Sequence, residues 1–334
     1  MKVSDIGEFG LIDLLAKMVN SARDNKAESW QKLLIGIGDD AAAWQGDASI
    51  QLATVDSLIQ GVHFSLDTAS WNELGWKAMA VNLSDIAAMG GMPRYALVSL
   101  ALPRQTEVED VTALYQGMIE LARRFGVAIV GGDTDCAPLL AITVTIFGSA
   151  DPKKHVLTRS TAKPGEQVAV TGYLGAAAAG LEMLSKQLQF DPDATTYFRN
   201  AFLHPYPRIA EGQLLVEQGV KTAIDISDGL ISDLRQVCKA SKVGARIGID
   251  CVPIHPAVKA NFGDKSLELA LSGGEDYELL FTGSSEVIDK VKRAAPCPVT
   301  VIGEITADEV GKITLIDKKG KPFELHKAGW EHFT

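Results

Sequence analysis

The chain has 334 residues, of which 46% are hydrophobic and 22% charged, a composition typical of a globular protein with a sizeable core. Its length favours two domains, and its formal charge of −10 argues against nucleic acids and anionic membranes as partners. The N-terminus lacks the basic and apolar regions of a secretory signal, and no apolar run approaches the roughly 18 residues of a membrane span.

The cysteines are few and widely spaced, and no pair forms a CxxC motif of the kind that binds zinc or performs redox chemistry. They are Cys136, Cys238, Cys251 and Cys297. This usage predicts reduced thiols in a cytoplasmic protein.

The first half of the chain alternates strand-like and helix-like segments, which predicts an α/β layer. We expect helices over residues 5–24, 76–89 and 107–125, strands over 50–55, 95–102, 127–130 and 139–147, and a strand or entry loop over 33–37. The strand over 50–55 would deliver Asp56 to its C-terminal end. The strand over 127–130 would run directly into Gly131-Gly132-Asp133.

A polar, basic segment over residues 151–154 marks the expected domain boundary, with one domain over 1–150 and a second over 151–334. In the second domain we expect a strand, an Ala-rich helix after a glycine turn, a helix from Arg208, and then a strand–helix pair followed by four more strands. These later elements cover residues 167–171, 176 onward, 220–226, 229–242, 245–250, 277–282, 299–303 and 313–316.

The expected helix after Trp76 carries an unusual pair of polar residues. Asn82 and Asp85 are three positions apart and project from one face, among apolar neighbours. A carboxylate is costly to bury in such surroundings without a positive or hydrogen-bonding partner, and no Lys or Arg lies between Asn82 and Pro93. A metal ion could supply the missing charge.

Further acidic residues occur at predicted strand and helix ends, in apolar or glycine-rich runs. They are found in GDD at 38–40, TVD at 54–56, GGDTD at 131–135 and DISDG at 225–229. Carboxylates without nearby His or Cys favour Mg²⁺ or Mn²⁺ over Zn²⁺. Any one of these residues could instead serve as a helix cap or turn residue.

Standard nucleotide-binding signatures are absent, since the sequence has no GxxxxGK[ST] and no GxGxxG after a strand. The turn at 172–175 fits either a simple turn or a phosphate contact, His63 fits a loop or core histidine, and Trp330 fits an anchoring aromatic. The residues alone therefore predict an α/β protein that binds divalent cations and phosphates, and they name no substrate.

Several runs, taken together and in order, carry a family resemblance. They are GIGDD at 36–40, VDSLIQGVHF at 55–64, VNLSDIAAMG at 81–90, GGDTD at 131–135, LTRSTAKPGE at 157–166, DISDGLISDL at 225–234 and SGGEDYEL at 272–279. The chain resembles the thiamine-monophosphate kinase family, whose members make thiamine diphosphate from thiamine monophosphate and ATP. The resemblance implies an α/β (α+β), two-domain, aminoimidazole ribonucleotide synthetase-like fold with mixed sheets flanked by helices.

The resemblance also implies site residues and an assembly. Implied Mg²⁺ ligands are Asp40, Thr54, Asp56, Asp85, Asp133, Asp225 and Asp228. Implied nucleotide contacts are Tyr115, Gly132, Asp133, Arg159 and Ser227, and implied substrate contacts are His63, Glu275 and Trp330. The N-terminal domain would hold the metal and ATP and pair into a homodimer, and the C-terminal domain would complete the nucleotide and substrate site.

The chemistry of the implied reaction sets an expectation for the mechanism. The acceptor is a phosphate monoester with a second pKa near 6, so its oxygen is already largely anionic at neutral pH. We expect direct in-line transfer of the γ-phosphoryl group with no protein general base, the carboxylates serving to hold several Mg²⁺ ions. Trp330 would stack on the thiazolium cation.

Two alternatives stay open. One is another ATP-using enzyme of the same superfamily, although the N-terminus lacks the reactive Cys and Gly-rich loop of selenophosphate synthetase. The other is a non-catalytic scaffold that binds metal for stability. One departure from relatives is Asp135-Cys136, where neutral or basic residues are common.

Overall fold

The computed structural model describes residues 1–37, 42–325 and 329. The chain divides into two compact units. Unit 1 comprises Met1–Ile86 and Met92–Pro152, and unit 2 comprises Ala87–Gly91 and the chain from Lys153 onward. None of the helices in the described part of the chain has the length and apolar character that crossing a bilayer requires.

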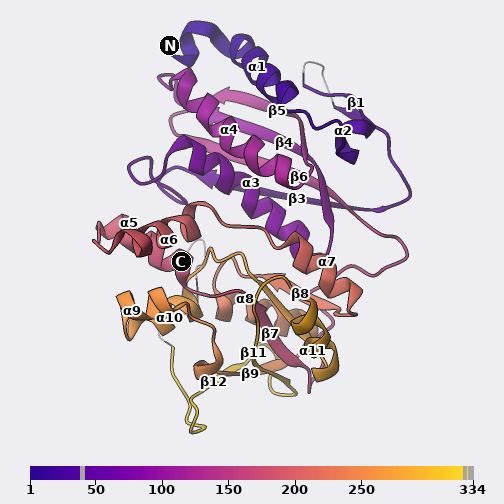
Figure 1. Ribbon diagram of the computed structural model, residues 1–334, viewed down its shortest axis with the longest axis vertical. Coiled ribbons are helices and arrows are strands. Elements are labelled where there is room, and N and C mark those ends of the chain that lie inside the picture. Colours follow the sequence, from indigo (N-terminus) through magenta and orange to yellow (C-terminus); the bar gives the residue numbers. More distant parts are fainter. Residues whose placement is uncertain (38–41, 326–328, 330–334) are drawn as a thin grey trace. The chain divides into compact units, whose positions relative to one another are not determined.

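Unit 1 is built on a four-stranded sheet. Its helices are α1 (Val3–Ser21), α2 (Glu28–Lys32), α3 (Trp71–Ala88) and α4 (Val108–Arg124), and its strands are β1 (Leu33–Ile35), β2 (Ala43–Trp44), β3 (Ile50–Ile59), β4 (Met92–Leu102), β5 (Ala128–Cys136) and β6 (Ala141–Ala150). The sheet order is β3-β6-β4-β5, with β4 and β5 parallel and the other pairs antiparallel. Helices α3 and α4 lie over one face of this sheet (Figure 1), and β1 pairs with β2 apart from it.

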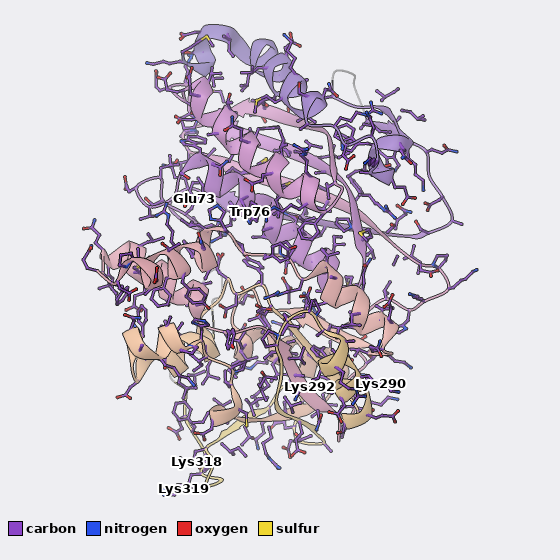
Figure 2. The ribbon with its side chains drawn as sticks, viewed as in Figure 1. Glu73, Trp76, Lys290, Lys292, Lys318 and Lys319 are labelled. Atoms are coloured by element: carbon purple, nitrogen blue, oxygen red, sulfur yellow. The ribbon has the colours of Figure 1, made fainter. Side chains whose placement is uncertain are left out.

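Helix α3 begins where the sequence supplies a reciprocal cap. The Ser70 hydroxyl accepts from the Glu73 N–H at 3.3 Å, and the Glu73 carboxylate accepts from the Ser70 N–H at 2.8 Å. This capping box satisfies donors that the first helical turn leaves unpaired, so the helix starts five residues before the expected Trp76. Figure 2 labels Glu73 and Trp76 on α3, and the Arg124 guanidinium lies over the Trp76 ring at 4.6 Å from its centroid.

Two glycines allow α3 and α4 to touch through their backbones. A Cβ placed on Gly75 would lie 1.8 Å from the Leu114 carbonyl oxygen, and one on Gly117 would lie 1.9 Å from the Asn72 carbonyl oxygen. No side chain fits in either place. The two glycines therefore fix how closely the helices pack above the sheet.

Unit 2 contains a six-stranded mixed sheet with helices packed around it. Its strands are β7 (Gln167–Thr171), β8 (Thr222–Asp225), β9 (Gly244–Gly248), β10 (Leu279–Gly283), β11 (Val299–Thr306) and β12 (Ile313–Ile316), in the order β12-β9-β11-β7-β10-β8. Its helices are α5 (Ala176–Lys186), α6 (Pro192–Leu203), α7 (Ile209–Glu217), α8 (Leu230–Ser241), η1 (Ile249–Cys251), α9 (Pro256–Phe262), α10 (Lys265–Ser272) and α11 (Ser285–Ala294). Only β12 and β9 pair in parallel among these strands as described. Apolar side chains of β7, β9 and β10 share one core with α5, α8 and α10.

The expected mixed α/β architecture is confirmed, but two strand ends are corrected. Strand β3 continues to Ile59, so Asp56 lies within the strand and not at its C-terminal end. Strand β5 continues through Gly131 and Gly132 to Cys136, so Asp133 also lies within a strand. Both are outer strands of the sheet, where the lack of one neighbour lets glycines and charged residues remain in an extended backbone.

Candidate functional site

Strand β3 and helix α3 bring two of the predicted metal ligands of unit 1 together. The Thr54 hydroxyl donates to Oδ2 of Asp85 at 2.5 Å, and both residues are half-buried. Asp56 is two positions beyond Thr54 on β3 and therefore points to the same, helix-covered face of the sheet. The predicted helix face with Asn82 and Asp85 is present on α3.

Asn82, one turn before Asp85, is fully buried. Its Nδ2 donates to the Ala78 carbonyl oxygen at 3.1 Å, whereas Oδ1 has no hydrogen-bond partner among the described residues. A buried amide oxygen without a donor is costly. This oxygen, the Asp85 carboxylate and the Thr54 hydroxyl are hard donors of the kind that Mg²⁺ prefers.

Strand β5 places Gly132 and Asp133 at the other edge of the sheet. A Cβ on Gly132 would lie 1.8 Å from the Val98 carbonyl oxygen, so only glycine fits there. The strand register pairs Asp133 with Ser99 of β4, while Asp56 pairs with Val144 of β6. Asp56 and Asp133 thus lie on opposite outer strands, three strand spacings or roughly 14 Å apart, and unit 1 does not bring these two carboxylates together.

The other predicted residues of unit 1 differ in accessibility. His63 lies in the loop after β3, where its Nδ1 accepts from the Ile59 N–H at 3.0 Å. Tyr115 on α4 is only 6% exposed, and burial raises the pKa of its hydroxyl above the ordinary value. Its ring is therefore mainly part of the helix–sheet core.

In unit 2, the DISDG run forms a tight loop between β8 and α8. Asp225 is the last residue of β8 and is 3% exposed. The N–H groups of Ser227, Asp228 and Gly229 all donate to Oδ2 of Asp233, each at 3.1 Å. Asp233 is the third Asp of DISDGLISDL, and sequence reasoning assigned it no role, although an acidic residue in the first turn of a helix such as α8 is a recognisable stabilising signal.

Negative charge accumulates around this loop. Burial first, and then the charges of Asp225 and Asp228, raise the pKa of the Asp233 carboxyl to about 8. Acidic side chains held this close together in partly apolar surroundings disfavour one another's ionised forms. The loop therefore has the charge distribution that a divalent cation would relieve.

The segment between α10 and β10, residues 273–278, packs directly against the DISDG loop and carries the predicted substrate residue Glu275. The Glu275 N–H donates to the Ser227 carbonyl oxygen at 2.8 Å, and the Tyr277 N–H donates to the Ile226 carbonyl oxygen at 2.9 Å. Glu275 and Tyr277 adopt positive φ angles of 72° and 50°. Such values are strained for residues other than glycine and cluster at functional sites.

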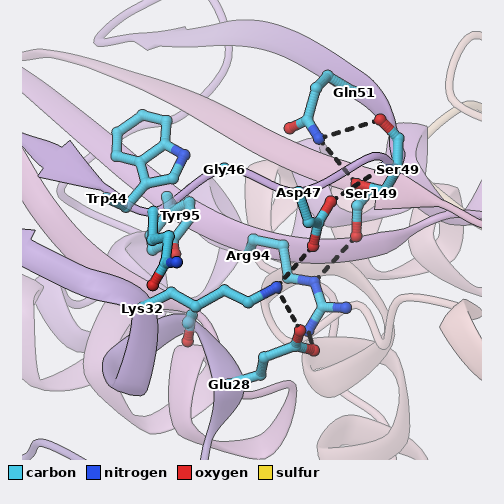
Figure 3. Close-up of a pocket in the computed structure, with 12 residues that line it drawn as sticks. Glu28, Lys32, Trp44, Gly46, Asp47, Ser49, Gln51, Arg94, Tyr95 and Ser149 are labelled. Atoms are coloured by element: carbon cyan, nitrogen blue, oxygen red, sulfur yellow. Dashed lines mark hydrogen bonds and ion pairs between the residues drawn. The ribbon is translucent and has the colours of Figure 1, made fainter.

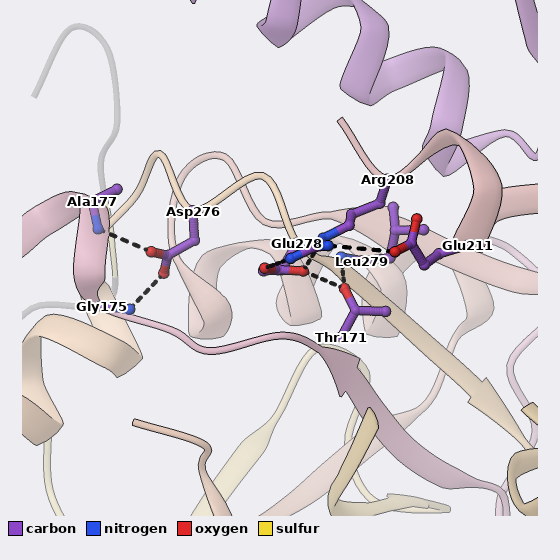
Figure 4. Close-up of polar contacts among 8 residues, drawn as sticks. All are labelled: Thr171, Gly175, Ala177, Arg208, Glu211, Asp276, Glu278 and Leu279. Atoms are coloured by element: carbon purple, nitrogen blue, oxygen red, sulfur yellow. Dashed lines mark hydrogen bonds and ion pairs between the residues drawn. The ribbon is translucent and has the colours of Figure 1, made fainter. Parts of the chain in front are cut away.

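Two acidic residues anchor this segment from either side (Figure 4). Asp276 accepts from the Gly175 N–H at 2.7 Å and the Ala177 N–H at 3.3 Å at the N-terminus of α5. Glu278 forms a bidentate pair with Arg208, with Nε–Oε2 at 2.7 Å and Nη2–Oε1 at 2.5 Å. Glu278 also accepts from the Thr171 hydroxyl at 2.6 Å. The turn that presents Glu275 is therefore held by side chains that sequence reasoning did not single out.

The three remaining predicted site residues are Arg159, Asp40 and Trp330. Arg159 is exposed in unit 2, and its carbonyl oxygen accepts from the Ser241 hydroxyl at 2.8 Å. Asp40 and Trp330 lie outside the described residues. The neighbouring Gly329 is described, and a Cβ there would lie 2.7 Å from the Asp228 carbonyl oxygen, so the chain approaches the DISDG loop one residue before Trp330.

The donor set fits a hard cation, but it is divided between the two units. Thr54, Asp56, Asp85 and Asp133 belong to unit 1, whereas Asp225 and Asp228 belong to unit 2. Across residues 1–37, 42–325 and 329, no three His, Cys, Asp or Glu side chains are grouped closely enough to form a metal site. Convergence of these ligands on shared ions stays a prediction.

A separate pocket of unit 1 contains none of the predicted site residues (Figure 3). Lys32 pairs with Glu28 at 2.7 Å and with Asp47 at 2.6 Å, and Arg94 pairs with Glu28 at 2.6 Å. Each of these charges is already neutralised by its neighbours. The pocket is therefore best explained as an ion-pair network that fastens α2 and β2 to β4.

Comparison with known proteins gives a consistent result along the chain. The family of AIR synthase related proteins matches through its N-terminal domain over residues 38–150 and its C-terminal domain over residues 163–316. Thiamine-monophosphate kinase of Bacillus subtilis is 38% identical over 309 residues, covering 90% of this chain and 93% of the relative.

Solved structures agree with the sequence relatives. Thiamine-monophosphate kinase from Stenotrophomonas maltophilia aligns with a TM-score of 0.82 and 32% identity, covering 92% of this chain and 96% of that one. AaThiL complexed with AMPPCP and TMP aligns with a TM-score of 0.76 and 31% identity, covering 100% and 99%. The two-domain fold expected from the motifs is thereby confirmed.

Proposed function

This chain belongs to the family of AIR synthase related proteins and, within it, to the thiamine-monophosphate kinases, and from that membership we propose that it phosphorylates thiamine monophosphate to thiamine diphosphate with ATP. The observation that carries the proposal is the end-to-end match to AaThiL complexed with AMPPCP, an ATP analogue, and TMP. The predicted nucleotide and substrate residues Ser227 and Glu275 are joined by a main-chain hydrogen bond, which agrees with a site where ATP and acceptor meet.

Magnesium is the cation that we propose for the acidic residues. The ligands would be Asp40, Thr54, Asp56, Asp85, Asp133, Asp225 and Asp228. Bound Mg²⁺ would screen the phosphates and offset the charge that develops during transfer. The support within the structure is chemical: hard oxygen donors, the Oδ1 of Asn82 that lacks a donor among the described residues, and the negative charge around Asp233.

The chain itself would bind and orient the two reactants. Tyr115, Gly132, Asp133, Arg159 and Ser227 would contact the nucleotide, and His63, Glu275 and Trp330 the thiamine monophosphate. At Gly132, the closely approached Val98 carbonyl shows that the backbone tolerates no side chain there. Trp330 stacked on the thiazolium ring would contribute on the order of 0.5–2 kcal/mol.

We propose direct in-line transfer of the γ-phosphoryl group without a protein general base. The acceptor phosphate, with a second pKa near 6, needs no residue to remove a proton at neutral pH. The role of the chain is then to align the attacking oxygen with the phosphorus atom and to exclude competing water. A phosphorylated residue trapped during turnover would contradict this mechanism.

We also propose a homodimer that forms through unit 1, and a cytoplasmic location. The sheet face opposite α3 and α4 carries Val55, Leu97, Ser99, Thr143 and Thr145, and Val55 is 58% exposed. We call these five residues the uncovered face. An exposed sheet face with apolar residues is a typical association surface.

The four cysteines are free, as is usual in a reducing compartment.

The decisive experiment is a turnover assay with the purified protein, ATP and MgCl₂ against a panel of phosphate acceptors. Thiamine monophosphate should give stoichiometric thiamine diphosphate and ADP, and thiamine and unrelated phosphate monoesters should give little product. Turnover of another acceptor in preference to thiamine monophosphate would favour a different ATP-using member of the family. Metal-dependent melting without product would favour the non-catalytic scaffold.

A further inference from the structure

The DISDG loop is fixed by one oxygen atom. Oδ2 of Asp233 accepts the N–H groups of three successive residues, Ser227, Asp228 and Gly229, each at 3.1 Å. Asp233 itself is 3% exposed and is held by α8, where its own N–H donates to the Gly229 carbonyl oxygen at 3.0 Å. Three donors converging on one buried acceptor determine the path of a loop more tightly than a single cap does.

Close backbone packing on the other side leaves the loop little room to move. A Cβ on Gly229 would lie 2.9 Å from the Ser272 carbonyl oxygen, and one on Gly274 would lie 2.3 Å from the Ser227 carbonyl oxygen. The Glu275 N–H donates to that same Ser227 oxygen at 2.8 Å. Ser227 is thus held by Asp233 through its N–H and by Glu275 through its carbonyl.

We propose that Asp233 is a positioning residue that fixes the Asp225–Asp228 loop and, through Ser227, the Glu275 turn. This positioning role rests on the proposed function. In that role, Asp233 contacts neither the substrate nor the cation. It acts through the residues whose backbone it holds. Oδ2 is occupied by three N–H donors, which leaves that oxygen poorly suited to ligate an ion.

Two substitutions separate positioning from direct ligation. Asp233→Asn removes the ionisable carboxyl group but keeps an oxygen in the same place, so the loop should retain its path. Asp233→Glu keeps the ionisable carboxyl group but displaces it by one methylene, so the three donors should lose their common acceptor. Positioning predicts that Asn is tolerated better than Glu, whereas a cation ligand at Asp233 predicts the reverse order.

Two measurements that do not depend on turnover report the effect. Mn²⁺ binding to the whole protein is followed by electron paramagnetic resonance, and AMPPCP binding in the presence of Mg²⁺ is followed by calorimetry. We expect Asp233→Glu to weaken both by at least tenfold, and Asp233→Asn to stay within about threefold of the unsubstituted protein. Hydrogen exchange of the peptide over residues 225–234 should accelerate in the Glu variant and change little in the Asn variant.

A matched control is available on another helix of unit 2. Asp191 caps α6 by accepting from the Ala194 N–H at 2.9 Å, and Asp191→Ala should leave Mn²⁺ and AMPPCP binding unchanged. Faster exchange in the loop with unaltered binding would overturn the proposal, and so would better binding by the Glu variant than by the Asn variant. If the unsubstituted protein binds Mn²⁺ and AMPPCP but does not phosphorylate thiamine monophosphate, the proposed function fails while the role of Asp233 is still tested.

Discussion

At the scale of single residues, the pair Thr54–Asp85 shows how an acidic side chain is kept in a mostly apolar helix. The 2.5 Å hydrogen bond from Thr54 satisfies one carboxylate oxygen. The Thr54 hydroxyl and the Asp85 carboxylate are both hard oxygen donors of the kind that a divalent cation prefers.

We predict that Asp85→Asn lowers kcat by about 100-fold or more and weakens the dependence of the rate on Mg²⁺ concentration, because it removes a formal charge from the cation site. Initial rates measured across a Mg²⁺ titration test this. The same substitution at the exposed Asp67 of unit 1 should leave the rates unchanged. Normal activity per folded molecule in the Asp85 variant would show that this carboxylate is merely structural.

Residues with a role in binding were easier to predict than the residues that support them. The motifs pointed to Asp225, Ser227, Asp228 and Glu275 because those residues resemble a family pattern. Asp233, Asp276 and Glu278 were missed, although each holds one of the same loops. Their role depends on which distant N–H or guanidinium group the fold brings to them, and spacing along the chain does not reveal it.

At the scale of elements, the contact between α3 and α4 depends on the absence of two side chains. A methyl group on Gly75 would enter the space of the Leu114 carbonyl, and the helices would have to separate. Since α3 carries Asp85 and packs on β6, where the Gly148 position lies against the Ile86 side chain, such a separation would also disturb the predicted site. Helix packing and function are therefore linked in unit 1.

We predict that Gly75→Ala lowers the free energy of unfolding by about 3 kcal/mol, because overpacking outweighs the roughly 1 kcal/mol gain in helix propensity. Urea denaturation followed by circular dichroism measures the change. Gly46→Ala is the control, since nothing lies within 4 Å of its added Cβ. Equal stability of the two variants would mean that the helices separate at little cost.

The cap on α5 should make stability depend on pH. Burial raises the pKa of Asp276 to about 8 from a model-compound value of 3.8. The folded protein therefore keeps this proton to higher pH than the unfolded chain does. The stabilising contribution is complete below about pH 4 and is lost as the pH rises to about 8.

We predict that the free energy of unfolding of the unsubstituted protein falls between pH 5 and 8 relative to that of Asp276→Asn, by at most about 1.4 kcal/mol per pH unit. Urea titrations at several pH values provide the comparison. The exposed Asp289→Asn variant should follow the unsubstituted protein. Parallel curves for the Asp276 and Asp289 variants would contradict the assigned cause.

The presence of most helices and strands was predictable from the sequence, whereas the C-terminal ends of β3 and β5, which carry predicted site residues, were not. The hydrophobic runs of β4, β6 and β7 follow directly from the sequence. Asp56 and Gly131-Gly132-Asp133 were expected outside their strands because Gly and Asp usually mark turns. Pairing with β6 and β4 keeps both segments extended, so tertiary hydrogen bonds override the local preference.

At the scale of the whole molecule, the predicted site residues are distributed over both compact units, and Asp40 and Trp330 lie outside the described residues. The sequence motifs identified the predicted site residues, because the order of these motifs along the chain is specific to the family. The motifs contain no information on the distances between those residues. The structure supplies those distances only within each unit, most clearly for Thr54–Asp85 and for the loops joined at Ser227.

The uncovered face of unit 1 should determine the oligomeric state. We predict that Val55→Asp shifts the protein from dimer to monomer, because a charge would replace an apolar contact at the centre of β3. Light scattering coupled to size-exclusion chromatography measures the mass directly. Val310→Asp in unit 2, a residue that is also exposed, is the control. A dimer that survives the first substitution would place the interface elsewhere.

The bond between the Glu275 N–H and the Ser227 carbonyl has a consequence for how this enzyme could change. Both atoms belong to the main chain, so substitutions of ordinary side chains cannot delete the connection between the two loops. Laboratory selection for new phosphate acceptors should therefore alter the Glu275 side chain, whereas the glycines that precede it in the same segment should be retained. If the whole 272–278 segment is exchanged between relatives, the preference for the acceptor should be transferred together with it.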